Sequence, residues 1–114
     1  MTECYPFLTK KTGNSIVANL ESSDLYPSYY HLFKANGYEG NGYCWEGHVI
    51  QILEKLDPEL HKQIEFDSET ERFYCTCDSS EIQERFIKTL APIFSEMDKL
   101  QSWISIADRS RIDD

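Results

Sequence analysis

The chain has 114 residues, of which 40% are hydrophobic and 13% aromatic, so it can bury a sizeable core and extended disorder is not expected. Its 20 acidic and 11 basic residues give a formal net charge of −9. This charge argues against nucleic acid and anionic membranes as partners, and it suits either a basic partner or simple solubility.

No hydrophobic run approaches the ~18 residues needed to cross a membrane. Residues 1–9 have neither a basic start nor a long apolar stretch, so we expect no signal peptide and a cytoplasmic location. In that compartment the four cysteines are expected to be free thiols. The length fits a single domain over residues 1–114.

The first third of the chain predicts a hairpin followed by a short helix. Residues 6–9 and 15–20 are strand candidates, and Gly13-Asn14 between them tolerates the positive φ of a tight turn. Residues 22–24 offer capping side chains, and Gly37 supplies a left-handed stop. Between these two signals, apolar residues recur at helical spacing at Leu25, Tyr29, Leu32 and Phe33.

A glycine-rich turn over residues 38–42 precedes a second predicted helix. The apolar residues of this helix share one stripe, which consists of Trp45, Val49, Ile52, Leu53 and Leu56. Asp57-Pro58 ends the helix, because the residue before proline disfavours helical conformation. We assign Trp45 mainly to the core, since it begins the stripe.

A second strand pair is predicted at residues 63–67 and 72–77, joined by an acidic turn over residues 68–71. In the second strand either Phe73 and Cys75 or Tyr74 and Thr76 form the buried side.

The longest helix is predicted to open at Ser80, with Gln83 three residues later completing a capping box. Pro92 should kink or break this helix, and a separate last helix is expected after Asp98. Residues 109–114 are predicted to be a frayed tail.

The element order is therefore ββ-αα-ββ-α(α). Paired strands with helices between and after them predict an α+β fold, in which an antiparallel sheet of about four strands carries helices on one face. Whether the two hairpins share one sheet is the least determined part of this prediction.

Two cysteine pairs raise the question of a metal site. Cys44 and His48 are spaced i, i+4 on a helix, and Cys75 and Cys77 share one face of a strand, a set that zinc would accept. Cys-x-Cys is far less diagnostic than Cys-x-x-Cys, so core packing is the favoured interpretation. Since no nucleophile lies in a recognisable catalytic motif either, we expect no metal, no cofactor and no enzymatic activity.

The glycine-rich turn lacks the Lys-Ser/Thr end of a phosphate-binding loop, so it is predicted to seat the following helix. It would leave Tyr38, Asn41 and Tyr43 at an exposed corner. Further along, acidic residues alternate at Glu65, Asp67, Glu69 and Glu71. Strand periodicity places the first three away from the apolar side, as either a solvated face or a patch that receives a cationic surface.

The stretch N-G-Y-E-G-N-G-Y-C-W-E-G at residues 36–47, followed by an aliphatic helix, resembles a signature of bacterial polymorphic-toxin immunity proteins. It is most similar to immunity family fifty-one, which pairs a G-Y-x-G-N-G-Y-x-W segment with a later F-D-S-E segment, here residues 37–45 and 66–69. The resemblance spans roughly residues 20 to 97, and the N-terminal hairpin lies outside it.

The resemblance implies a cytoplasmic protein that binds a cognate toxin domain and neutralises it by direct, stoichiometric inhibition, without a cofactor. A basic nuclease is one kind of toxin domain that an acidic inhibitor suits. We expect the exposed contacts at the glycine-rich corner and the acidic hairpin, namely Tyr38, Glu39, Asn41, Tyr43, Glu46, Asp67, Glu69 and Glu71.

Two other interpretations stay open at this point. A small acidic adaptor domain with no toxin partner would have the same composition. A homodimer would absorb aromatic side chains that exceed what one face of a small core can hold, at Tyr29, Tyr30, Phe33 and Trp103.

Overall fold

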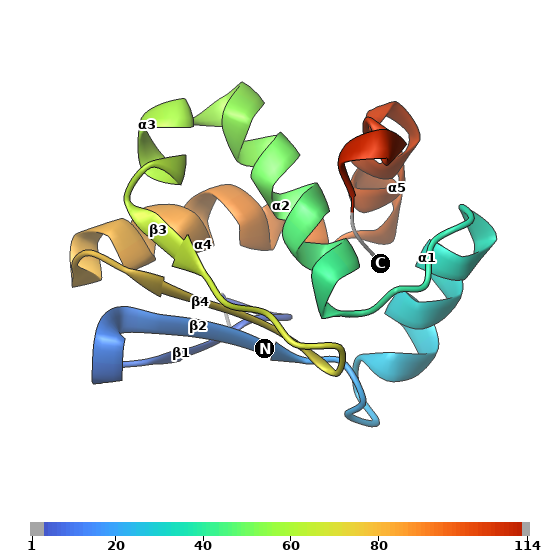
Figure 1. The fold of residues 1–114 in the computed structure, drawn as a ribbon. Helices are drawn as coiled ribbons and strands as arrows, with labels where there is room; N and C mark the ends of the chain where they lie inside the picture. The colour runs from blue at the N-terminus through green and yellow to red at the C-terminus, as the bar shows by residue number, and fades with distance from the viewer. Residues whose placement is uncertain (1–3, 113–114) are drawn as a thin grey trace.

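A computed structural model describes residues 4–112, in which helices cover one face of a four-stranded antiparallel sheet (Figure 1). The sheet order is β1-β2-β4-β3. The strands are β1 (Leu8–Lys10), β2 (Ser15–Asn19), β3 (Ile64–Phe66) and β4 (Arg72–Cys77). The α-helices are α1 (His31–Ala35), α2 (Gly42–Leu56), α3 (Pro58–His61), α4 (Ser80–Phe94) and α5 (Met97–Ile106). The predicted α+β fold is confirmed.

The two hairpins form one sheet because β2 and β4 pair along their whole length. Ile16 lies opposite Cys75, and Ala18 lies opposite Phe73. All four side chains are fully buried. The alternation that left two possibilities for β4 is thereby resolved in favour of Phe73, Cys75 and Cys77 as its inner side.

Trp45 lies in the middle of the core, as its place at the start of the α2 stripe predicts. Its side chain is fully buried, and its ring centroid lies 5.0 Å from that of Phe94 and 5.1 Å from that of Tyr29. Phe7 meets the indole edge-on at 6.0 Å. Packed aromatic pairs of this kind add to the free energy gained by burial.

The first helical segment differs in detail from the prediction. It begins as one π-helical turn, η2 (Tyr26–Tyr30), before α1 continues it. Tyr29 and Phe33 are buried inside the chain, so the aromatic surplus that favoured a homodimer is smaller than predicted. Gly37 ends α1 with a φ of +88°, the left-handed stop that the sequence indicates.

Helix α2 is longer than its apolar stripe. It begins at Gly42, where Asn41 caps it by accepting a hydrogen bond of 2.9 Å from the Cys44 amide. Leu56, the last member of the predicted stripe, is 50% exposed, so its assignment to the core is wrong. The chain turns away at Asp57, and Pro58 then opens the short α3.

The start of α4 is shifted by one residue from the predicted capping box. Ser79 is the cap, since its hydroxyl accepts a hydrogen bond of 3.2 Å from the Ile82 amide. Gln83 instead donates hydrogen bonds to the carbonyls of Lys10 and Ser15, which ties α4 to the first hairpin. Pro92 lies within α4 and does not break it at that position, but the helix ends two residues later, at Phe94.

The prediction of a frayed tail is wrong for residues 109–112. A 3₁₀ turn, η3 (Arg109–Arg111), follows α5, and Ile112 is only 9% exposed. Ile112 packs against Gly47 of α2, and Arg111 pairs with Glu54 of the same helix at 2.7 Å. Residues 113 and 114 lie outside the described part of the chain. Within that part, no helix combines the length and apolar character needed to traverse a bilayer.

Candidate partner-binding surface

The glycine-rich corner and the acidic turn, predicted separately, are in direct contact. The Gly42 amide donates a hydrogen bond of 2.9 Å to the Thr70 carbonyl. A Cβ atom on Gly42 would lie 1.8 Å from the carbonyl oxygen of Glu69 and 2.2 Å from that of Arg72. Only glycine allows this approach, so the start of α2 and the β3–β4 turn form one continuous surface.

Glu46 forms a second link between the same two segments. Its carboxylate accepts a hydrogen bond of 3.4 Å from the Ser68 amide. Glu46 is half-buried, as is Asn41, whose side chain is engaged in capping α2. Both predicted contact residues therefore hold the surface in shape, and each presents only part of its side chain to solvent.

The remaining members of the predicted set are exposed, with one exception. Tyr43 is 40% exposed, and Glu39, Asp67, Glu69 and Glu71 are exposed as well. Tyr38 is not, since only 5% of it reaches solvent.

The prediction that Tyr38 is an exposed contact is wrong because of the way α1 ends. The Tyr38 amide donates to the Phe33 carbonyl and the Gly37 amide to that of Lys34, which is a Schellman motif. In this motif the residue after glycine packs back against the helix. The Tyr38 ring meets the His48 ring at 4.8 Å, and the Arg109 guanidinium lies 4.5 Å from its centroid. An apolar residue directly after the glycine stop was the sequence signal for this burial.

A groove lies between the corner, the acidic turn and η2, and we call it the Tyr26 groove. It has a volume of about 210 Å³. The acidic and aromatic residues that line it include Glu21, Tyr26, Tyr30, Glu39, Trp45 and Glu71. A second hollow of about 380 Å³, which also borders Glu69 and Arg72, shares Glu21 and Glu71 with it.

The contact residues predicted from the sequence did not include Glu21, Tyr26 or Tyr30 of this groove. Tyr26 and Tyr30 are spaced i, i+4 and lie off the stripe made by Leu25 and Tyr29, so helical periodicity pointed to an outward aromatic pair. Their rings stack at 4.8 Å with an interplanar angle of 14°. Glu21 lies two residues after the end of β2, and only the pairing of β2 with β4 brings it beside the acidic turn.

The family model of Immunity protein 51 matches residues 7–109. The chain belongs to the immunity protein 51 family. No curated protein and no solved structure matches it. The match reaches further than the resemblance seen in the sequence, since it includes the N-terminal hairpin as well as every residue of the surface described above. Membership of an immunity family implies a toxin partner in general.

The cysteine and histidine residues of this immunity protein 51 chain do not assemble into the zinc set considered from the sequence. Within residues 4–112 there is no group of three His, Cys, Asp or Glu side chains arranged to hold a metal ion. The Cys44 sulfur lies 3.7 Å from His48 Nδ1, and both residues are almost fully buried. A hydrogen bond with the Cys77 thiol and burial both raise the pKa of the Cys75 thiol, which keeps Cys75 protonated and unreactive.

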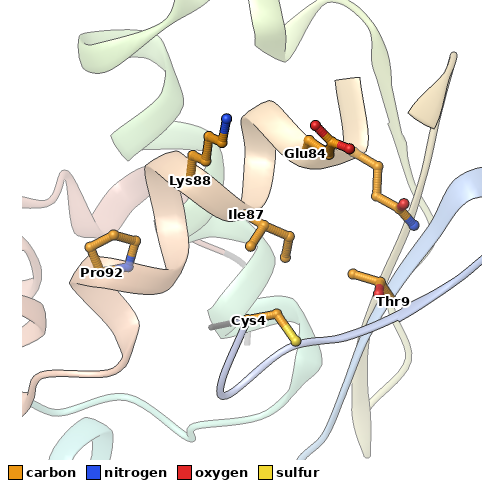
Figure 2. Close-up of a pocket in the computed structure, with 7 residues that line it drawn as sticks. Cys4, Thr9, Glu84, Ile87, Lys88 and Pro92 are labelled. Atoms are coloured by element: carbon orange, nitrogen blue, oxygen red, sulfur yellow. The ribbon is translucent and has the colours of Figure 1, made fainter. Parts of the chain in front are cut away.

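A larger groove lies between the segment that leads into β1 and helix α4, with a volume of about 890 Å³. Figure 2 shows Cys4 and Thr9 on its strand side and Ile87 pointing toward Cys4 from α4. Among the described residues that line it, the charged ones are one acid and one base, Glu84 and Lys88. As far as the described residues go, its lining carries fewer acidic side chains than that of the Tyr26 groove, which we take as the candidate site of this immunity protein 51 chain.

Proposed function

We propose that this chain is a cytoplasmic immunity protein that binds its cognate toxin domain directly, in a stoichiometric complex, and inhibits it by occlusion. The observation that carries the proposal is the contact between the corner and the acidic turn. Glu39, Tyr43, Asp67, Glu69 and Glu71 are exposed residues of the two segments that Gly42 and Glu46 hold together. An exposed aromatic residue among carboxylates is a composition that tight protein interfaces use.

The charge of the chain supports a basic partner. With a formal net charge of −9, the protein attracts a cationic domain over a distance of about 8–10 Å at ordinary salt, and this accelerates association. A nuclease, whose active site is built to receive phosphate, presents such a cationic surface. We therefore propose a basic nuclease domain as the toxin, with this protein acting by binding and not by chemistry.

The test is co-production of the protein with the toxin domain encoded beside it, followed by purification of the complex at low and at high salt. We expect protection of the cells and a one-to-one complex whose association rate falls as salt rises. A protein that neither protects nor binds would support the alternative, an acidic adaptor domain without a toxin partner. If the complex forms and is unaffected by salt, the basic partner is excluded while the immunity function stands.

A further inference from the structure

Two cations of the chain itself lie at the glycine-rich corner and at the acidic turn, and both are held in the same manner. Lys34 Nζ lies 3.5 Å from a carboxylate oxygen of Glu39 and 5.8 Å from the ring centroid of Tyr30. On the other side, Arg72 lies 2.8 Å from Glu69, and its guanidinium is 5.2 Å from the ring centroid of Tyr74. Each cation is thus held by one carboxylate and one tyrosine ring. The chemistry of this part of the molecule favours positively charged groups.

Between these two pairs lie two carboxylates without a cation. Glu21 and Glu71 are exposed, and both border the Tyr26 groove and the neighbouring hollow. Within residues 4–112 neither forms an ion pair. Their backbones are fixed side by side, because the Leu20 amide donates a hydrogen bond of 3.1 Å to the Glu71 carbonyl. Two neighbouring carboxylates repel each other, and a single cation between them would remove that repulsion.

The walls of the Tyr26 groove add aromatic surface. Tyr26 is 44% exposed and stacks on Tyr30. Trp45 borders the groove although it is fully buried.

We propose that an arginine side chain of the toxin binds in the Tyr26 groove, with its guanidinium between Glu21 and Glu71 and its stem along the Tyr26–Tyr30 pair. The inference rests on the proposed function for the protein that supplies the arginine. A volume of about 210 Å³ suits one side chain and is too small for a helix. Arginine fits better than lysine because its planar guanidinium binds two carboxylates at once and stacks on aromatic rings.

The groove can be tested without the toxin. N-acetyl-arginine N-methylamide is titrated into the ¹⁵N-labelled full chain, with the capped citrulline analogue as the neutral control. We expect shift changes at residues 21, 26, 30 and 71 with the arginine probe only. These changes should disappear in Glu21→Gln/Glu71→Gln and persist in Glu81→Gln/Glu84→Gln. The second variant loses the same charge from exposed positions on α4, at the opposite end of the sheet. Changes that are scattered over all acidic residues, or that survive in the first variant, overturn the proposal.

The complex with the toxin domain gives the second readout. Glu21→Gln/Glu71→Gln should weaken the affinity by about tenfold or more, and Glu81→Gln/Glu84→Gln by less than about threefold. Tyr26→Leu, which keeps the apolar contact and removes the ring, should weaken it as well. If the wild-type protein binds and both double variants bind equally well, the arginine site is wrong and the immunity function stands. If the wild-type protein binds no toxin, the proposed function fails, and the titration still decides whether the groove takes a guanidinium.

Discussion

The guanidinium of Arg109, near the C-terminal end of the chain, lies over the ring of Tyr38 and donates a hydrogen bond to the carbonyl of Gly37. The segment beyond α5 thus covers the glycine-rich corner from outside. Asp108 adds two hydrogen bonds with Gln51 of α2, at 2.8 Å and 2.9 Å. The corner is therefore stabilised both by the acidic turn on one side and by the C-terminal segment on the other.

Replacement of Arg109 by alanine should lower the free energy of unfolding by about 1 kcal/mol, through loss of the cation–π contact and one hydrogen bond. Arg109→Lys should retain part of this energy, because the ammonium can still lie over Tyr38. Urea unfolding followed by tryptophan fluorescence measures both. Equal stability of Arg109→Ala and wild type would show that the C-terminal segment does not support the corner.

Gly47 and Ile112 should show strong coupling. A Cβ atom on Gly47 would lie 2.9 Å from Ile112 Cγ1, so Gly47→Ala requires Ile112 to move and should not stabilise the wild-type protein. In an Ile112→Ala background the overlap with the side chain is removed and the closest remaining neighbour is the Cα atom of residue 112, at 3.2 Å. The same change should therefore be more favourable there than in the wild type, by about 1 kcal/mol. A double-mutant cycle in urea gives the coupling energy. Additive effects would contradict the packing of Ile112 on α2.

Trp45→Ala should cost about 3–5 kcal/mol of stability, because the indole is fully buried among aromatic rings. The matched control is Trp103→Ala in α5, which removes a tryptophan that is only partly buried and should cost less. A loss below about 1 kcal/mol for Trp45→Ala would move this residue from the core to the surface. Urea midpoints monitored by circular dichroism avoid the loss of the fluorescent probe.

Gly42→Ala should separate the corner from the acidic turn. Since its Cβ would overlap backbone carbonyl oxygens, which cannot rotate away, the expected loss is about 2 kcal/mol or more. Hydrogen exchange should also accelerate at the Gly42 amide, which donates to Thr70. An unchanged melting temperature together with unchanged exchange would contradict the close approach of the two segments.

The Arg85–Asp57 pair gives the protein a defined response to acid. Hydrogen bonds from Arg85 at 2.7 Å and 2.9 Å hold the pKa of the Asp57 carboxyl below its ordinary value. A lowered pKa stabilises the fold above the unfolded-state pKa of about 3.9, and the contribution disappears as pH falls through the folded-state value. Asp57→Asn should therefore be less stable than wild type at pH 7 and equal to it near pH 2. Urea unfolding at a series of pH values checks this. A difference in stability between Asp57→Asn and wild type that persists at pH 2 would assign the effect to the hydrogen bond that caps Leu60 instead.

The parts of the fold that follow from local pattern were predictable. The Gly13-Asn14 turn, the Gly37 stop and the stripe from Trp45 to Leu53 each depend on residues close together in the chain, and each of these predictions is confirmed. Leu56 and Ile112 were assigned wrongly because tertiary contacts decide their burial. Helix periodicity predicted that Leu56 belongs to the core, and the position of Ile112 near the end of the chain predicted that it does not.

The candidate surface was predictable only in part, for the same reason. The corner and the acidic turn were each recognisable from residue type. Their contact through Gly42, and the presence of Glu21 beside them, depend on the register between β2 and β4, which no local pattern specifies.

The direct backbone contact at Gly42 affects the rate at which a complex can form. Because the corner and the turn are locked together without an intervening side chain, the surface that a partner meets exists before the encounter. Binding then requires little ordering of loops, so less of the interaction energy is lost as conformational entropy. Association should be set by diffusion and by the attraction between opposite charges, and dissociation by the few side chains seated in the Tyr26 groove.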